Sequence, residues 1–104
     1  VEINQTPYKH SVLLSSDGET LEWPVKSFGD LEVNHFSQIA NLKPELILIG
    51  TGSRQQFPRP ELLKNLILAK IGFEIMDSQA ACRTYNILVG EGRKVLLALI
   101  VEPG

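Results

Sequence analysis

The stretch that decides the fold is residues 76–93, which read Met-Asp-Ser-Gln-Ala-Ala-Cys-Arg-Thr-Tyr-Asn-Ile-Leu-Val-Gly-Glu-Gly-Arg. This stretch holds the only Cys and the only Met of the chain. It begins with Asp77 and Ser78, a pair of the kind that caps a helix, and continues as a short amphipathic run. Gly90-Glu91-Gly92 then stops the run. The stretch therefore predicts one passage from a strand through a helix into a second strand.

The flanking residues supply those two strands. Residues 73–76 precede the helix as one strand, and residues 94–101 follow it as another, apolar throughout after Lys94. Ser78 is expected to cap the helix. The helix is predicted to present one apolar side, formed by Ala81, Cys82, Tyr85, Leu88 and Val89.

Two further elements lie ahead of this passage. Residues 46–49, Leu-Ile-Leu-Ile, form an unbroken apolar run between turn residues, as expected of a strand covered on both faces. Residues 61–71 have leucines at helical spacing, with Pro60 at the start and Gly72 just past the end. The second half thus reads strand, helix, strand, helix, strand. Because parallel crossovers are right-handed, strands that pair in this order place both helices on one face.

The first half predicts a hairpin and one short helix. Residues 8–14 and 20–25 flank Ser15-Ser16-Asp17-Gly18, a turn signal between two strands. Pro24 puts the second strand at an edge or ends it, since proline cannot donate a ladder hydrogen bond. Residues 35–40 fit a helix capped by Asn34, with Phe36, Ile39 and Ala40 on its inner face.

Length and charge limit the class of protein. A chain of 104 residues suits one domain, and we expect a single α/β domain over residues 1–104. A net charge of −2 with ten scattered Lys and Arg offers no basic face, so no nucleic acid partner is expected. The longest apolar run, residues 95–101, is far shorter than the roughly 20 residues that span a bilayer. No transmembrane segment is therefore predicted.

The single Cys and the start of the chain bear on location. One Cys forms no internal disulfide, which favours a reducing compartment, and no signal-peptide pattern opens the sequence. These features predict a cytoplasmic location. The chain begins with Val1 rather than Met, so what precedes it stays open.

Gly50-Thr51-Gly52-Ser53 follows a predicted strand and is similar to loops whose amides approach an anion closely. It lacks the third glycine of a dinucleotide fingerprint and the Gly-Lys-Ser/Thr of a P-loop. The alternative is that the glycines only allow a sharp turn out of a buried strand. We favour the turn over the ligand loop.

Cys82 has two interpretations as well. Near Arg83 in the first part of a helix it is a candidate reactive thiol, whereas free Cys is also among the most buried residue types. The buried interpretation is favoured, because neither His10 nor His35 is paired with Cys82 by spacing. No metal cluster and no acid and base pair is recognisable, and Asp77 is expected to cap a helix. No catalytic residue, metal ligand or cofactor is therefore assigned.

Arg83, Tyr85 and Asn86 offer a cation, a hydroxyl and an amide within one helical turn. Clefts outside the carboxyl ends of parallel strands bind ligands in open α/β sheets, and two predicted strands end here. Their alternative role is hydrogen bonding to neighbouring loops. The candidate ligand-binding residues are Gly50, Thr51, Gly52, Ser53, Arg83, Tyr85 and Asn86.

Three motifs together resemble one known family: Pro44-Glu45-Leu46-Ile47-Leu48-Ile49-Gly50-Thr51-Gly52, Gly72-Phe73-Glu74-Ile75-Met76-Asp77 and Ala80-Ala81-Cys82-Arg83-Thr84-Tyr85-Asn86-Ile87-Leu88, with Glu91-Gly92-Arg93 behind them. It is the family of small α/β domains that includes the mitochondrial respiratory complex I assembly factor 3. The resemblance implies a mixed sheet bent on itself in β/β/α layers, with the helices packed on one side. It implies no enzymatic activity and no catalytic residue. The short chain, without an evident transit peptide, is more similar to a bacterial member.

Two hypotheses of function follow. The first is a non-catalytic protein-binding or assembly-factor-like module, which predicts a protein partner and a surface patch of apolar groups. The second is a small-molecule or anion-binding domain, a class that includes enzymes, whose cleft lies between residues 50–53 and residues 82–86. We adopt the first and keep the second as the alternative.

Overall fold

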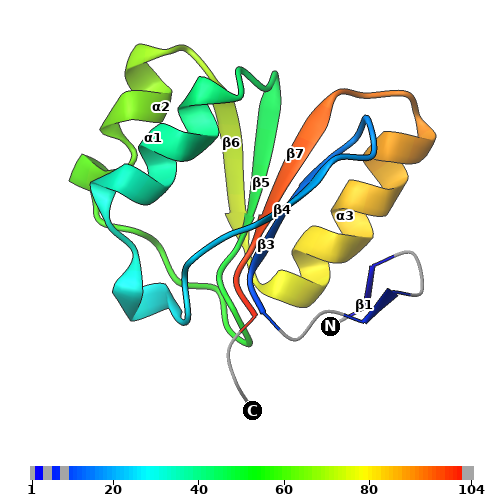
Figure 1. The fold of residues 1–104 in the computed structure, drawn as a ribbon, viewed down its shortest axis with the longest axis horizontal. Helices are drawn as coiled ribbons and strands as arrows, with labels where there is room; N and C mark the ends of the chain where they lie inside the picture. Colours follow the sequence, from blue (N-terminus) through cyan, green and yellow to red (C-terminus); the bar gives the residue numbers. More distant parts are fainter. Residues whose placement is uncertain (1, 4–5, 8–9, 102–104) are drawn as a thin grey trace.

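Five strands form one mixed sheet in the order β4-β3-β7-β5-β6 (Figure 1). The computed structural model describes residues 2–3, 6–7 and 10–101, with side chains from residue 10 onward. The central strands β5 and β7 run parallel to each other and to β6, and β3 runs antiparallel to both β7 and β4. The strands are β3 (Val12–Ser15), β4 (Thr20–Glu22), β5 (Leu46–Gly50), β6 (Gly72–Met76) and β7 (Val95–Leu99).

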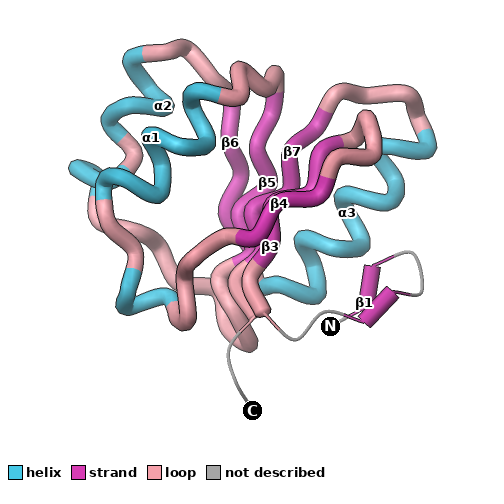
Figure 2. Tube along the Cα trace, viewed as in Figure 1, coloured by secondary structure: helices cyan, strands magenta, loops and turns pink. Residues whose placement is uncertain are grey.

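Helices cover both faces of this sheet (Figures 1 and 2). Helices α1 (Val33–Asn41) and α2 (Lys64–Leu68) lie on one face, and α3 (Ser78–Gly90) lies on the other. Two 3-10 turns, η1 (Phe28–Asp30) and η2 (Pro60–Leu62), lead into α1 and α2. A separate two-stranded pair, β1 (Glu2–Ile3) with β2 (Thr6–Pro7), lies near α3.

The predicted α/β class with a mixed sheet is confirmed, but the expectation that the helices pack on one side is wrong. The chain passes from β5 through α2 outward to β6, and then returns through α3 across β5 to β7. Right-handed crossovers that travel in opposite directions place their helices on opposite faces. Strand order therefore makes the layers helix, sheet, helix.

Each face of the sheet has its own apolar core. Phe36 and Ile39 of α1 and Leu66 of α2 pack with Ile47 and Ile49 on one face. On the other face, the α3 side chains Ala81, Cys82 and Tyr85 pack with alternate residues of the same strands, among them Leu48, Leu97 and Leu99. In β5, Ile47 and Ile49 face one core and Leu48 faces the other, so the sequence prediction of a strand covered on both faces is confirmed. All five residues of β7 are buried as well.

The hairpin forms as predicted, with shorter strands. The predicted first strand includes residues 8–9, which lie outside the described residues, and β3 begins only at Val12. Strand β4 ends at Glu22 and lies at the edge of the sheet, as Pro24 predicted. Trp23 turns inward to 1% exposure and meets Phe36 edge-on, with the ring centroids 6.3 Å apart.

The predicted cap of α1 is wrong. The helix begins at Val33 after Glu32, so Asn34 lies inside the first turn. The Glu32 N–H donates to His35 Nδ1 at 2.9 Å, and this ring nitrogen satisfies the amide that precedes the helix. Glu32 takes the N-cap position in place of Asn34, and it forms a capping box in which its side chain accepts from the His35 backbone N–H.

The predicted helix over residues 61–71 divides into η2 and the short α2, and its stop signal is also wrong. Pro60 begins η2 as expected. Lys70 has a positive φ of 58° and ends the helical region, whereas Gly72 is already the first residue of β6. The chain reverses from α2 into β6 within residues 69–71, so the left-handed residue must fall before Gly72.

Gly50 allows the closest approach of β5 to its neighbours. A Cβ at this position would lie 2.8 Å from Leu99 Cδ1 and 3.0 Å from both Cα and Oγ of Ser78. Because Ser78 Cα belongs to the backbone of α3, it cannot move aside cheaply.

We predict that Gly50→Ala lowers the free energy of unfolding by about 1–3 kcal/mol through this overpacking. Gly90→Ala is the matched control, since a Cβ there meets nothing within 4 Å at the end of α3. Urea denaturation followed by circular dichroism measures both variants. An equal stability of the Gly50 variant and the wild type would contradict the close approach.

Candidate functional site

The carboxyl ends of β5 and β6 meet the first turn of α3, where sequence reasoning placed a ligand cleft. Asp77 caps α3, because its Oδ1 accepts a hydrogen bond from Ala80 N–H at 2.9 Å. The capping role predicted for Asp77 is confirmed. Ser78 is instead the first helical residue, and its hydroxyl is used elsewhere.

The Ser78 hydroxyl joins three segments of chain. Its Oγ accepts from Gly52 N–H at 2.8 Å and donates to the Ile100 carbonyl at 2.7 Å. The Ser78 N–H donates in turn to the Gly52 carbonyl at 2.8 Å. Ser78 is only 3% exposed, so these bonds lie away from solvent. Gly52 takes a φ of +101°, a conformation that favours glycine.

Thr51 closes the loop that follows β5. Its Oγ1 donates to the Arg54 carbonyl at 2.7 Å and accepts from Gln56 N–H at 3.1 Å. Its own N–H donates to the Met76 carbonyl at 2.9 Å. Thr51 is fully buried. Both the side chain and the amide of this residue are therefore engaged with the protein itself.

The predicted ligand-binding residues divide between core and surface. Gly50, Thr51 and Gly52 are buried, and Ser53 is exposed. On α3, Tyr85 packs into the core, whereas Arg83 and Asn86 are exposed. The structure brings Gly50 and Gly52 against Ser78 at the start of α3, and it turns Tyr85 away from the surface that carries Arg83 and Asn86. A ligand-binding role for these residues stays a prediction.

Cys82 lies in the core between α3 and the sheet, at 5% exposure. Burial raises the pKa of the Cys82 thiol, and the weaker effect of the neighbouring Arg83 guanidinium, which lowers it, does not compensate. The protonated thiol is the less nucleophilic form. Burial and protonation together favour a packing role over a reactive one.

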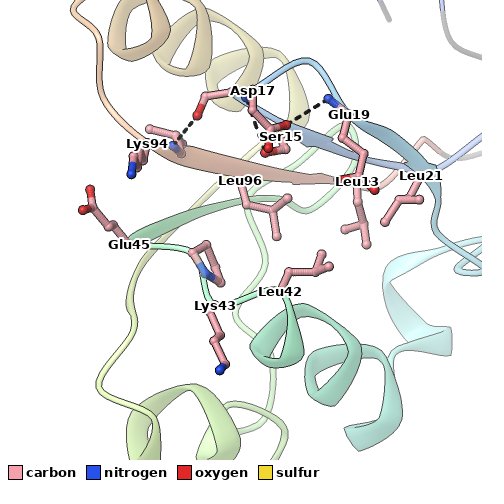
Figure 3. A pocket seen from close by; sticks show the side chains of 13 residues that line it. Leu13, Ser15, Asp17, Glu19, Leu21, Leu42, Lys43, Glu45, Lys94 and Leu96 are labelled. Carbon is pink, nitrogen blue, oxygen red and sulfur yellow. Dashed lines mark hydrogen bonds between the residues drawn. The ribbon is translucent and has the colours of Figure 1, made fainter.

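A groove not predicted from the sequence lies at the opposite end of the sheet, where β5 and β7 begin. This hairpin groove has a volume of about 380 Å³. Leu13, Leu21, Leu42 and Leu96 point toward one another in its middle (Figure 3). The remaining lining residues are Ser15, Ser16, Asp17, Glu19, Lys43, Pro44, Glu45, Val95 and Lys94.

Charged side chains surround the apolar middle of the hairpin groove. Asp17 and Glu19 come from the hairpin, Lys94 lies beside Asp17 just ahead of β7, and Lys43 and Glu45 come from the opposite wall (Figure 3). The Glu19 N–H donates to Asp17 Oδ1 at 3.1 Å, and this bond lowers the pKa of the Asp17 carboxyl below its usual range. The bond therefore stabilises the charged form of Asp17 on the hairpin side of the groove.

Sequence reasoning missed this groove because its walls come from three separate segments, residues 13–21, 42–45 and 94–96. The turn residues 15–19 predicted only a hairpin, and Leu42 and Lys43 were assigned no role. Local sequence patterns identify elements, whereas this groove forms only where the separate segments meet in the folded chain.

The described part of the chain adds two observations about other classes of site. Within it, no helix combines the length and apolar character needed to cross a membrane. Nor do its His, Cys, Asp and Glu side chains gather in threes where a metal ion could be held.

A mixed five-stranded sheet between a two-helix layer and a single long helix, with its strand ends closed by Ser78, defines a small α/β domain protein. The chain belongs to the family described as "Protein of unknown function (DUF498/DUF598)", which matches residues 1–100. The family resemblance inferred from the three sequence motifs is confirmed.

Two relatives illustrate the range of this family. The "13 kDa major membrane protein" of Francisella tularensis subsp. holarctica (strain LVS) is 35% identical over 100 residues, which are 94% of this chain and 80% of that protein. The "NADH dehydrogenase (ubiquinone) 1 alpha subcomplex assembly factor 3" of Bos taurus is 36% identical over 86 residues, which are 81% of this chain. The aligned part is only 47% of that assembly factor, so the chain spans about half its length.

A solved structure shows the same fold. The crystal structure of a protein from Bordetella parapertussis is similar to this chain, with a TM-score of 0.85 and 42% sequence identity. The aligned region covers 93% of this chain and 83% of the Bordetella chain. The similarity extends over nearly the whole arrangement of sheet and helices described above.

We predict that Ser78→Ala lowers the free energy of unfolding by about 2–3 kcal/mol, because it leaves the buried Gly52 N–H and Ile100 carbonyl without their partner. Ser53→Ala, an exposed serine in the neighbouring loop, is the control and should change stability by less than about 0.5 kcal/mol. Chemical denaturation of the three proteins measures the difference. A loss of the same size in both variants would contradict a special role for Ser78.

Proposed function

We propose that this chain is a non-catalytic protein-binding module that acts in the assembly of a multi-subunit complex. The observation that carries the proposal is its 36% identity over 86 residues to a protein named as an assembly factor of NADH dehydrogenase. The aligned length is enough to include most of the sheet and its helices. The proposal takes the class of activity from this relative and leaves the identity of the partner to experiment, because half of that relative lies outside the match.

The surface supports a protein partner. Ile67 and Leu68 are neighbours on α2 and are 59% and 69% exposed, and Phe57 in the loop before η2 is 69% exposed. Exposed large apolar side chains are among the features of protein interaction surfaces. The hairpin groove adds a second apolar surface of the kind that receives a partner's side chain.

The alternative predicted from the sequence, a small-molecule or anion site between residues 50–53 and residues 82–86, has less support. The Thr51 and Gly52 amides, which would face an anion, donate instead to Met76 and Ser78. Arg83 is exposed on α3 while Cys82 is buried beneath it. These arrangements favour a role in the fold for the loop and leave the protein-binding hypothesis as the better one.

We predict that deleting the gene in its host lowers the amount of mature respiratory NADH dehydrogenase and leaves partly assembled forms, which native gel electrophoresis with activity staining resolves. Complementation with the wild-type chain should restore the complex. The Ile67→Lys, Leu68→Glu double variant tests whether the exposed surface of α2 binds the partner, and it should fail to restore the complex. Lys64→Gln, at an exposed position on the same helix, is the control and should restore it.

Purification of the tagged chain after cross-linking in cells gives the second measurement. A partner that recurs across replicates and depends on the tag is the expected result. Normal amounts of the complex in the deletion strain, together with no recurring partner, would contradict the proposed function.

A further inference from the structure

We propose that the hairpin groove and the free edge of β4 together receive an extended, basic segment of a partner protein, which adds a strand to the sheet and places one apolar side chain in the groove. This inference rests on the proposed protein-binding function and names the class of partner. It stands on three features: the apolar middle of the groove, the unpaired edge beside it, and the acidic side chains between them.

The groove suits an apolar side chain. Its middle is formed by leucines from β3, β4, β7 and the end of α1, of which Leu42 is 42% exposed. A volume of about 380 Å³ lies near the lower limit of pockets that hold small ligands, and it exceeds the size of one leucine or phenylalanine side chain. Filling it would remove apolar surface of Leu21 and Leu42 from water.

The backbone of β4 is available for pairing. Two hydrogen bonds flank the strand and fix its alternation: Ser15 N–H to Glu19 O at 2.8 Å and Trp23 N–H to Ser11 O at 3.0 Å. Bonded pairs recur at every second residue of an antiparallel ladder, so Leu21 bonds inward to Leu13. Thr20 and Glu22 therefore direct their N–H and C=O groups to the free edge. An added strand would pair with these groups, a recurring mode of peptide recognition.

The pleat links that edge to the groove. Side chains alternate between faces, so Glu19 and Leu21 share the groove face, and both line the groove. A segment paired with β4 also presents every second side chain to this face. The side chain beside Leu21 would enter the groove, and the side chain two positions away would lie beside the Glu19 carboxylate. The preferred segment therefore has an apolar residue two positions from a Lys or Arg.

Charge also argues for a basic segment from a different protein. Asp17, Glu19 and Glu22 make the hairpin acidic, and the hydrogen bond from Glu19 N–H lowers the pKa of the Asp17 carboxyl. Lys94 lies beside Asp17 and offsets its charge at the turn, which leaves Glu19, next to Leu21, as the acidic side chain that faces an added strand. Pairing of β4 with β4 of a second copy would bring the acidic side chains of both hairpins together, and like charges opposite one another are destabilising. A cationic strand removes that conflict.

Selection from a phage-displayed library of random seven-residue peptides, with the biotinylated full chain as bait, tests this inference. We expect enriched peptides with an apolar residue two positions from Lys or Arg. With Glu19→Lys as bait, the basic position should change to Asp or Glu, and the affinity of the original peptides should fall about fivefold. Glu74→Lys makes the same charge change on the opposite edge strand β6 and should leave the selection unchanged.

A second measurement places the peptide on the protein. Methylation of the peptide amides that face β4 should abolish binding, whereas methylation of the alternate amides should not, and NMR shifts should concentrate at residues 19–22 and in the groove leucines. Failure to enrich peptides, enrichment without the apolar and basic spacing, equal response to both bait variants, or shifts elsewhere would each overturn the inference.

The two proposals fail separately. If the deletion strain lacks assembled complex but no peptide binds beside β4, the assembly role stands and the partner uses another surface. If peptides bind as described but the complex assembles normally without the chain, only the assembly role falls.

Discussion

The closure of the ends of β5 and β7 against α3 depends on the Ser78 hydroxyl. It accepts from Gly52 N–H after β5 and donates to the Ile100 carbonyl after β7, while its own residue begins α3. Both bonds are buried. Without the Ser78 hydroxyl, the Gly52 N–H and the Ile100 carbonyl would have no partner, and no water reaches them to take its place. Gly50 is required beside them because a side chain there would strike Ser78. Ser78 thus connects the ends of β5 and β7 to the start of α3.

This closure changes where function is to be sought. In open α/β sheets the crevice at the carboxyl ends of the strands is the usual ligand site. Here that place is occupied by the protein's own groups, with Thr51 buried and Gly52 bonded on both its N–H and its carbonyl. A groove lies instead at the other end of the sheet, with Leu13 and Leu96 among the residues that line it. This groove is where the proposed partner segment would be held.

Local patterns predicted the elements that local physics determines. The run from Leu46 to Ile49 is unbroken and apolar because both faces of β5 are covered, and Asp77 caps α3 through its own side chain. The errors have two sources. At the start of α1 the local choice of cap was wrong, because Glu32 and not Asn34 is the N-cap residue. The face covered by α3 is decided by distant groups, because β7 pairs with β5 on the side away from β6. The hairpin groove could not be predicted from local sequence patterns, because Leu13, Leu42 and Leu96 come together only in the folded chain.

Hydrogen exchange of the Gly52 amide tests the central claim most directly. If the Ser78 bonds hold the strand ends as one unit, this loop amide exchanges only when the whole domain unfolds, with the same free energy and urea dependence as the amide of Leu97 in the middle of β7. Exchange of Gly52 through a local opening, at much lower free energy and with little dependence on urea, would contradict the account.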